Sequence, residues 1–448
     1  MNRSRIISSH EDCLDLKGAC MSIQSCPDWE KSGKVVQLVG NMIEAGGLEA
    51  ALGDIFRISN PGSQIPIYAQ VVGFNQKRLK LSPLTAMDGI QPGALVSPHP
   101  HAQTIAAGPG LLGRILNGMG HPIDDKGPLP PGSPYPLTAR VVNPLRRPLI
   151  TKQLDVGVRS VNGLLPIGKG QRMGIFSGSG VGKSTLLGMM ARHTTAPVNV
   201  IALIGERGRE VNEFLENELG REGLGHSVVV VATSNQPATI RLRGAYLACT
   251  IAEYFRDQGQ DVLFMMDSVT RFAMAAREIG LAAGEPPTSK AYTPSVFSQM
   301  PQLLERAGNF ENASITGIYT VLVEGDDLED PVADALRSIL DGHIVLDRKL
   351  AHQHQYPAIN ILKSVSRLTD QLLTREQKAP LAHFVQTLAR YESNEDMINI
   401  GAYVAGTNPE TDYAITMHDK LCQYLRQPVH ERCPINEAQD ALAALLQA

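Results

Sequence analysis

The segment Ser177–Thr185 reads "SGSGVGKST" and joins the apolar run Gln171–Phe176 to a helix-like stretch, "KSTLLGMMARH". Glycine-rich loops between a strand and a helix bind phosphate because successive backbone N–H groups point inward and the helix N-terminus adds positive partial charge. The segment therefore predicts a nucleotide phosphate loop in an α/β domain. Such loops serve many kinds of protein, so the question is what the nucleotide's energy drives.

The loop residues have separate expected roles. Lys183 would reach the β- and γ-phosphates of ATP, and the Ser184 hydroxyl would ligate Mg²⁺. The glycines allow unusual backbone angles and a close approach to the phosphates. Ser177 departs from the usual pattern, which has glycine at that position. The predicted nucleotide-binding residues of the loop are Ser177, Gly178, Ser179, Gly180, Val181, Gly182, Lys183, Ser184 and Thr185.

Two further segments place carboxylates after apolar strands. "DVLFMMD" ends in Asp267, which we expect at the edge of the sheet where ligands bind, holding Mg²⁺ through water. "LIGERGRE" places Glu206 directly after a strand, where it could polarise a water in line with the γ-phosphate. Glu210 follows on the helix, and a supporting role there is as well founded as plain solvation of a helix start.

The chain around the loop alternates apolar strands with amphipathic helices, which predicts a parallel α/β sheet. The expected strands are Gln171–Phe176, 198–205, 227–234, 261–267, 314–322 and 342–347.

The two ends of the chain have a different texture. Short β-branched runs broken by Gly, Asn and Pro predict a β-barrel over residues 31–98, and a Pro- and Gly-rich connector follows. Helical periodicity predicts a helical domain over 371–448, which leaves 99–370 for the nucleotide-binding domain. Residues 1–30 are polar and irregular, and we expect a flexible segment that binds a partner.

Composition narrows the class of protein. The 448 residues are 43% hydrophobic and 19% charged, and the net charge of −4 gives no strong attraction to nucleic acid. No apolar run approaches the roughly 18 residues of a membrane helix, and the N-terminus lacks a secretory signal pattern. Six scattered cysteines without a CxxC pair indicate free thiols. These features predict a cytoplasmic protein.

The motifs together resemble one family, the flagellar type III protein-export ATPases, also called flagellum-specific ATP synthases. This family is related to the injectisome ATPases and, more distantly, to the α and β subunits of rotary ATP synthases. The segments that carry the resemblance are "GQRMGIFSGSGVGKSTLLGMMAR", "ALIGERGREV", "MDSVTRFAMAAREIGLAAGEPP", "YTVLVEGDD", "SILDGHIVLDRKLA" and "YPAINILKSVSRL".

The resemblance implies further site residues. It makes Glu206 the catalytic carboxylate with Arg207 beside it, and it makes Arg367, in "SVSR", an arginine finger that reaches a neighbour's γ-phosphate. Tyr356 matches a position that packs against adenine, although a core aromatic at a strand end is the alternative. Ala291 stands where the family usually has glycine, so that loop is expected to be stiffer.

The resemblance also implies a setting and partners. It implies a homohexamer that hydrolyses ATP at the cytoplasmic face of the inner-membrane export apparatus and supports the unfolding and export of flagellar subunits. The implied partners are a stator-like regulatory dimer at residues 1–30, a stalk protein, export-gate membrane proteins and chaperone–substrate complexes.

Three alternatives remain open at this point. An injectisome ATPase would share the chemistry but export different cargo. A non-catalytic ring subunit is disfavoured by Glu206, because such subunits tend to lack the catalytic carboxylate. An RNA-unwinding hexamer is disfavoured by the net charge and by the lack of an aromatic-rich basic strand face.

Overall fold

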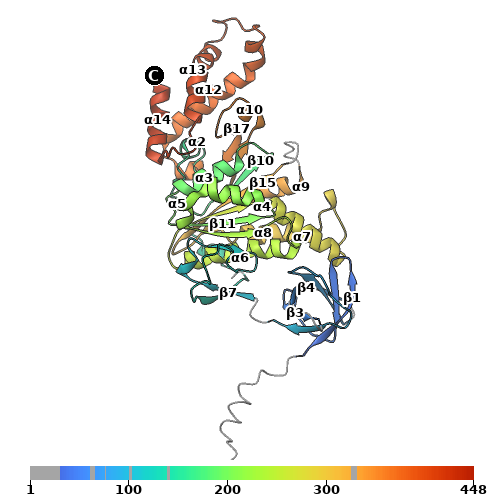
Figure 1. Cartoon of the computed structure of the whole chain (residues 1–448). Helices are drawn as coiled ribbons and strands as arrows, with labels where there is room; N and C mark the ends of the chain where they lie inside the picture. The colour runs from blue at the N-terminus through green and yellow to red at the C-terminus, as the bar shows by residue number, and fades with distance from the viewer. Residues whose placement is uncertain are drawn as a thin grey trace, which may run out of the picture.

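The computed structural model shows three regions in succession: a β-barrel, a central sheet covered by helices, and a helical C-terminal region (Figure 1). The proposed partner-binding segment, residues 1–30, lies outside the described residues. The structure describes residues 31–60, 66–75, 77–99, 103–138, 142–323 and 330–447.

Six antiparallel strands close the barrel in the order β1-β2-β5-β4-β3-β6. Its core is formed by small and β-branched side chains such as Val35, Ile43, Ile58 and Val96, which the alternating pattern of each strand turns inward. The strands are β1 (Gly33–Val39), β2 (Met42–Gly46), β3 (Ile55–Ser59), β4 (Ile67–Asn75), β5 (Arg78–Pro83) and β6 (Leu95–Pro98).

The central sheet has the order β17-β16-β10-β15-β13-β11-β12-β8, with β14 paired to β15. From β16 to β8 the neighbours run parallel, and β17 at one edge is antiparallel. A separate ribbon joins β7 (Thr104–Ala107) to β9 (Ser133–Pro136). The sheet strands are β8 (Ile115–Asn117), β10 (Arg172–Ser177), β11 (Val198–Ile204), β12 (Ser227–Ala232), β13 (Val262–Asp267), β14 (Gly308–Asn309), β15 (Ser314–Leu322), β16 (Gly342–Leu346) and β17 (Ile359–Ser366).

Helices cover both faces of this sheet, which explains why its inner strands read as continuous apolar runs. All seven residues of β11 are buried, and they alternate between two cores. Val200 and Ala202 pack in the core beneath the helices over residues 238–257, 269–283, 294–304 and 331–339, labelled α6 to α9 in Figure 1. Ile201 and Leu203 pack in the core beneath the helices over residues 183–193 and 208–213, labelled α3 and α4. Parallel strands of this kind bring their carboxyl ends to one edge of the sheet, here called the carboxyl edge. The opposite edge is called the amino edge.

The helix starts follow from local capping. Thr374 and Gln377 form a capping box at the start of α12, and Asn408 caps α13 ahead of Pro409.

The helices of the nucleotide-binding region are α2 (Arg159–Leu164), α3 (Lys183–His193), α4 (Gly208–Glu213), the π-helical turn η4 (Phe214–Leu219), α5 (Gly220–Gly225), α6 (Ala238–Asp257), α7 (Val269–Ala283), α8 (Pro294–Leu304), α9 (Pro331–Ile339) and α10 (Arg348–His352), with short 3₁₀ turns η2 (Pro109–Leu111), η3 (Pro144–Arg146) and η5 (Ser289–Ala291).

The C-terminal region consists of α11 (Thr369–Leu372), α12 (Arg375–Asn399), α13 (Pro409–Leu425) and α14 (Ile435–Gln447). Phe384 on α12 and Leu421 on α13 belong to the same buried cluster as α3, so this region packs directly on the nucleotide-binding region. Within the described ranges, no helix combines the length and apolar character that crossing a membrane requires. The predicted fold class, a parallel-sheet nucleotide domain between a β-barrel and a helical region, is confirmed.

Candidate active site

The phosphate loop has the conformation that its sequence predicts. β10 ends at Ser177, and α3 begins at Lys183. Gly180 and Gly182 adopt φ values of 76° and 89°, in the left-handed region that glycine tolerates best. The buried Val181 anchors the loop to the core, while Ser179 and Gly180 are exposed. The loop therefore presents its backbone to solvent at the start of an eleven-residue helix.

Ser177 sits differently from the rest of the loop. Its side chain is buried at the end of β10, and its hydroxyl makes no hydrogen bond in the described part of the chain. Gly178 beside it is also buried. Ser177 thus takes the first position of the motif with its side chain turned inward.

Three predicted residues meet at the carboxyl edge. Lys183 Nζ lies 2.5 Å from Asp267 Oδ1 at the end of β13 and 3.6 Å from Glu206 Oε1 after β11. All three side chains are largely buried, at 13%, 6% and 12% exposure respectively. Thr320, on the intervening strand β15, donates a hydrogen bond to Asp267 at 2.7 Å. Lys183 at the start of α3, Glu206 after β11 and Asp267 at the end of β13 therefore build one charged cluster beside the phosphate loop.

The pKa values of Glu206 and Lys183 are both raised in this cluster. Burial, together with the negative charge of Asp267, raises the pKa of Glu206 to about 7, against the opposing effect of Lys183 and with a further increase from Glu210. Burial opposes the charged form of Lys183, but the carboxylates of Asp267 and Glu206 outweigh it, so the pKa of Lys183 lies above its usual value. Glu206 is therefore a carboxylate poised near neutral pH beside a cation, as a general base requires.

The donor set fits a magnesium ion that arrives with a nucleotide. Asp267 supplies a carboxylate and Ser184, exposed on the first turn of α3, supplies a hydroxyl, and both are oxygen donors of the kind Mg²⁺ prefers. Among the described residues no group of three or more His, Cys, Asp and Glu side chains could hold a metal ion alone. Mg²⁺ is commonly held by one or two protein ligands together with substrate phosphates.

Tyr356 lies against the phosphate loop from another element. A side-chain carbon placed on Gly182 would lie 3.6 Å from two atoms of the Tyr356 ring. The residue is 41% exposed, so Tyr356 is not the core aromatic that the sequence left as an alternative. An exposed aromatic face beside a phosphate loop is suited to stacking on a base.

The two predicted arginines lie outside the charged cluster. The Arg207 side chain is 78% exposed and pairs with Glu210 at 3.4 Å. Arg367 follows β17 at the amino edge, where its backbone N–H donates to the carbonyl of Asp341 and its guanidinium donates to the carbonyl of Arg337. The phosphate loop begins at the carboxyl edge. Arg367 is therefore on the far side of the sheet from the loop of its own chain.

The sequence analysis did not single out Arg271, which lies close to the segment that carries Glu206. This residue lies in the first turn of α7, four positions after Asp267, and its stem packs against Gly205, where an added side-chain carbon would lie 2.6 Å from Arg271 Cβ. Its Nε is buried without a hydrogen bond in the described part of the chain. A guanidinium held beside the loop that carries Glu206 is suited to an anion. The sequence could have pointed to Arg271, because in "MDSVTRF" it follows Asp267 by four positions.

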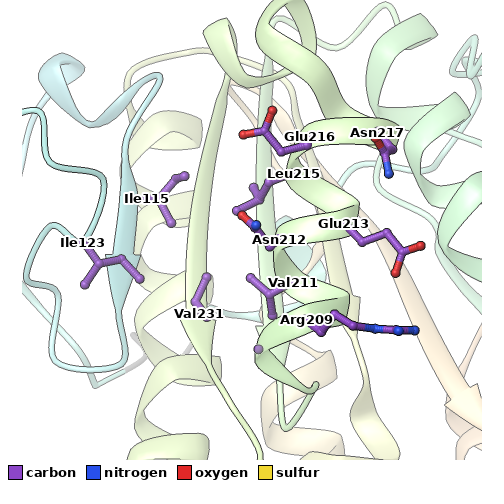
Figure 2. Close-up of a pocket in the computed structure, with 11 residues that line it drawn as sticks. Ile115, Ile123, Arg209, Val211, Asn212, Glu213, Leu215, Glu216, Asn217 and Val231 are labelled. Atoms are coloured by element: carbon purple, nitrogen blue, oxygen red, sulfur yellow. The ribbon is translucent and has the colours of Figure 1, made fainter.

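A groove of about 790 Å³ is lined by residues of β8, β12, α4 and η4, and by none of the phosphate loop or the charged cluster. Figure 2 shows Ile115 and Ile123 on one side and the α4–η4 segment on the other. Val211, Leu215 and Val231 add apolar surface between them. The groove shares α4 with the segment that follows Glu206.

Two family models match the chain. Residues 157–366 match the nucleotide-binding domain of the ATP synthase alpha/beta family, and residues 373–444 match the T3SS EscN ATPase C-terminal domain.

Individual relatives and solved structures match at high identity. The flagellum-specific ATP synthase of Bacillus subtilis (strain 168) is 51% identical over 94% of this chain and 97% of its own length. The type 3 secretion system ATPase of Xanthomonas euvesicatoria is 46% identical over 89% and 90%. The structure of the assembled ATPase EscN from the enteropathogenic E. coli type III secretion system aligns with a TM-score of 0.87, at 43% identity over 92% of this chain and all of that one.

Proposed function

Because this chain belongs to the flagellum-specific ATP synthase family, we propose that it hydrolyses ATP to energise the export of flagellar proteins. The observation that carries the proposal is the contact of Lys183 with Asp267 and Glu206 beside the phosphate loop. This cluster joins a phosphate-binding cation to a carboxylate that can activate water.

Different residues of the chain would bind the phosphates, accept the proton and hold the adenine. The loop backbone and Lys183 would bind the β- and γ-phosphates, and the loop geometry would hold the γ-phosphate in front of Glu206. Glu206 would accept a proton from the attacking water, since its raised pKa makes it a stronger base than an ordinary carboxylate. Tyr356 would stack on the adenine, and Arg271 and Arg207 would offer positive charge to phosphate oxygens.

Magnesium would be held by Ser184 directly and by Asp267 through water. When bound, the ion supplies charge neutralisation on the β- and γ-phosphate oxygens. Lys183 would leave Asp267 as the phosphates enter, because the new anionic partner competes for the same ammonium group.

The position of Arg367 supports action in a neighbouring subunit. Asp341 connects Arg367 to Arg172 through backbone hydrogen bonds, and Arg172 is the first residue of β10. Five residues of strand, about 17 Å, separate Arg172 from Ser177. Arg367 would therefore complete a site in another chain, as an arginine finger does, and a homohexameric ring would satisfy every site. The assembled EscN structure is a precedent for assembly in a similar protein.

The proposed setting is the cytoplasmic face of the inner-membrane export apparatus. A stalk protein is the best supported partner, because EscN has been solved in complex with its central stalk EscO, at 41% identity and a TM-score of 0.84 to this chain. A stator-like regulatory dimer, export-gate membrane proteins and chaperone–substrate complexes complete the proposed partners. Nucleic acid is not among them.

An injectisome ATPase is the second candidate. The C-terminal match to the EscN domain and the 46% identity to a type 3 secretion system ATPase favour it. Flagellum-specific relatives reach 51% and 48% identity, so the flagellar function remains our proposal. A flagellar and an injectisome ATPase would use the same active site and would differ in the proteins that they help to export.

Turnover and motility test the proposal together. Purified protein is expected to hydrolyse Mg²⁺–ATP. Lys183→Ala should lose nucleotide binding and turnover, whereas Glu206→Gln should keep binding and lose turnover by about 10² to 10⁴. Full turnover in Glu206→Gln would refute the role of the carboxylate.

The gene should also restore swimming to a strain that lacks its own flagellar export ATPase. Restored effector secretion without restored swimming would transfer the function to the injectisome.

A further inference from the structure

The π-helical turn η4 spaces buried residues in an unusual way. Val211 and Phe214 are buried three positions apart, as in an α-helix, but the next buried residue is Leu219, five positions after Phe214. The backbone N–H of Gly220 donates to the carbonyl of Leu215, which is the hydrogen bond of a π-turn. An unbroken α-helix would direct Glu218 toward the core, four residues after Phe214. The wide turn buries Leu219 and leaves Glu218 half-buried beside α3.

Glu218 makes a specific contact with the phosphate-loop helix. The Thr185 hydroxyl donates a hydrogen bond to Glu218 Oε1 at 2.8 Å, across 33 positions of sequence. Thr185 belongs to the first turn of α3 and follows Lys183 and Ser184 directly. The carboxylate of Glu218 therefore holds the turn that carries the phosphate-binding cation and the proposed magnesium ligand.

Close backbone packing supports this contact. A side-chain carbon on Gly188 of α3 would lie 2.7 Å from Glu218 Cβ and 2.8 Å from the Glu218 carbonyl oxygen. Such distances leave no room for a larger residue, so glycine lets η4 approach α3 closely. The same continuous segment, α4 and η4, begins two residues after Glu206.

We infer that Glu218 is a positioning residue, which acts through Thr185 to orient the first turn of α3, and with it the Ser184 hydroxyl, for Mg²⁺–nucleotide. Because α4 and η4 follow Glu206, the contact also fixes the spacing between the water-activating carboxylate and the magnesium ligand. This inference rests on the proposed ATPase function and adds a specific residue to it.

Alternative explanations make different predictions. If the hydrogen bond only tethered two helices, its loss would lower thermal stability and would weaken nucleotide binding equally with and without Mg²⁺. A positioning role predicts a loss confined to the metal-dependent state, since only that state uses the Ser184 hydroxyl.

The test compares nucleotide binding with and without magnesium in the full chain. A fluorescent ATP analogue is titrated in excess Mg²⁺ and in EDTA, and steady-state ATPase is measured against Mg²⁺ concentration. Thr185→Val and Glu218→Ala are each expected to raise the Mg²⁺ concentration for half-maximal turnover by about tenfold, the lower end of the range for residues that support a metal ligand. Affinity in EDTA should stay within twofold of wild type.

Rescue and coupling sharpen the test. Thr185→Ser keeps the hydroxyl and should raise the Mg²⁺ requirement less than Thr185→Val does. Glu218→Gln keeps an acceptor oxygen and should raise the Mg²⁺ requirement less than Glu218→Ala does. The double variant Thr185→Val/Glu218→Ala should be no worse than the more affected single variant, because both changes remove one interaction. The matched control is Glu216→Ala, an exposed carboxylate on the same turn that lines the groove (Figure 2).

Several results would overturn the inference. They are an unchanged Mg²⁺ dependence in Thr185→Val or Glu218→Ala, an equal loss of affinity in EDTA, or multiplicative effects in the double variant. If Thr185→Val does not fold, as judged by its melting curve, Glu218→Ala decides the question with α3 intact. Absence of ATPase in the wild type would refute the proposed function, while the two binding titrations would still decide the role of Glu218.

Discussion

The carboxyl and amino edges of the central sheet carry different parts of the proposed chemistry. At the carboxyl edge, Lys183, Glu206 and Asp267 come together although they lie far apart in the sequence. At the amino edge, Arg367 donates hydrogen bonds to the backbone carbonyls of Asp341 and Arg337 and has no phosphate loop near it. If Arg367 is the arginine finger, as we propose, the phosphate site of one chain needs the Arg367 of another chain.

The difference arises from the direction of one strand. β17 runs antiparallel to β16, with Ser366 opposite Gly342, so it begins shortly after Tyr356 at the carboxyl edge and ends at Ser366, directly before Arg367, on the amino edge. A parallel β17 would have returned its C-terminal residue to the carboxyl edge. The proposed dependence on assembly would thus follow from strand topology.

The first prediction tests this separation directly and has the largest effect. Arg367→Ala should lower the turnover of assembled protein by about 10³ or more, since a finger stabilises charge on the transferring phosphate. Turnover per chain of the wild type should rise with protein concentration. Mixing Arg367→Ala with Glu206→Gln chains should restore part of the activity, because some interfaces then join an intact Glu206 site to an intact Arg367.

Mixed assemblies are confirmed by native mass spectrometry, and each variant mixed with itself is the control. Confirmed mixed rings without recovered turnover would mean that Arg367 does not act across an interface.

The second prediction concerns pH at the carboxyl edge. Glu206 must be ionised to accept a proton, and burial raises its pKa to about 7, so turnover should fall as the pH drops below that value. Glu210 contributes to this raised pKa. Glu210→Gln removes that contribution and lowers the pKa of Glu206, so the acid limb should move to lower pH and the rate at about pH 6 should exceed that of the wild type.

Glu213→Gln is the matched control, because Glu213 lies one turn further along the same helical segment and lines the groove. Its profile should overlay that of the wild type, which separates the titration of Glu206 from that of the substrate. If the acid limb lies at the same pH in Glu210→Gln and in the wild type, Glu206 is not the general base.

The sequence was most informative where chemistry limits the choice of residues. The six expected strands of the sheet are all present, because long apolar runs that alternate with helices leave few topologies. β8 was not predicted, because a three-residue strand is too short to show hydrophobic periodicity. β17, "INILKSVS", was not predicted, because its polar residues interrupt the apolar pattern that identified the other strands. Nothing in its composition reveals its antiparallel direction, and that direction separates Arg367 from the loop.

Contacts between distant segments were beyond sequence reasoning. The π-turn that places Glu218 beside Thr185 is visible only in the structure, where the spacing of buried residues changes from three to five. The pairing of Arg271 with Gly205 depends on how α7 packs beside β11. The roles of the individual site residues remain predictions.

The last prediction compares two loops on the carboxyl side and has the smallest effect. The phosphate loop takes left-handed backbone angles at glycines, whereas the turn η5 takes them at Lys290 and Ala291, with φ values of 47° and 60°. Lys290 pairs with Asp330, which caps α9 where the chain leaves the carboxyl edge. A left-handed angle costs a residue with a side chain about 1 to 2 kcal/mol, so Ala291→Gly should relieve strain that the phosphate loop avoids.

Glycine also makes the unfolded chain more flexible, which offsets about 0.4 to 1 kcal/mol of that gain. A net stabilisation of about 0.5 kcal/mol is expected, seen as a small rise in the denaturant midpoint at unchanged slope. Ala382→Gly, on the exposed side of α12, is the control and should lower the midpoint, because glycine costs about 1 kcal/mol within a helix. If both changes lower the midpoint alike, Ala291 is not strained, and its loop tolerates the side chain as well as a helix does.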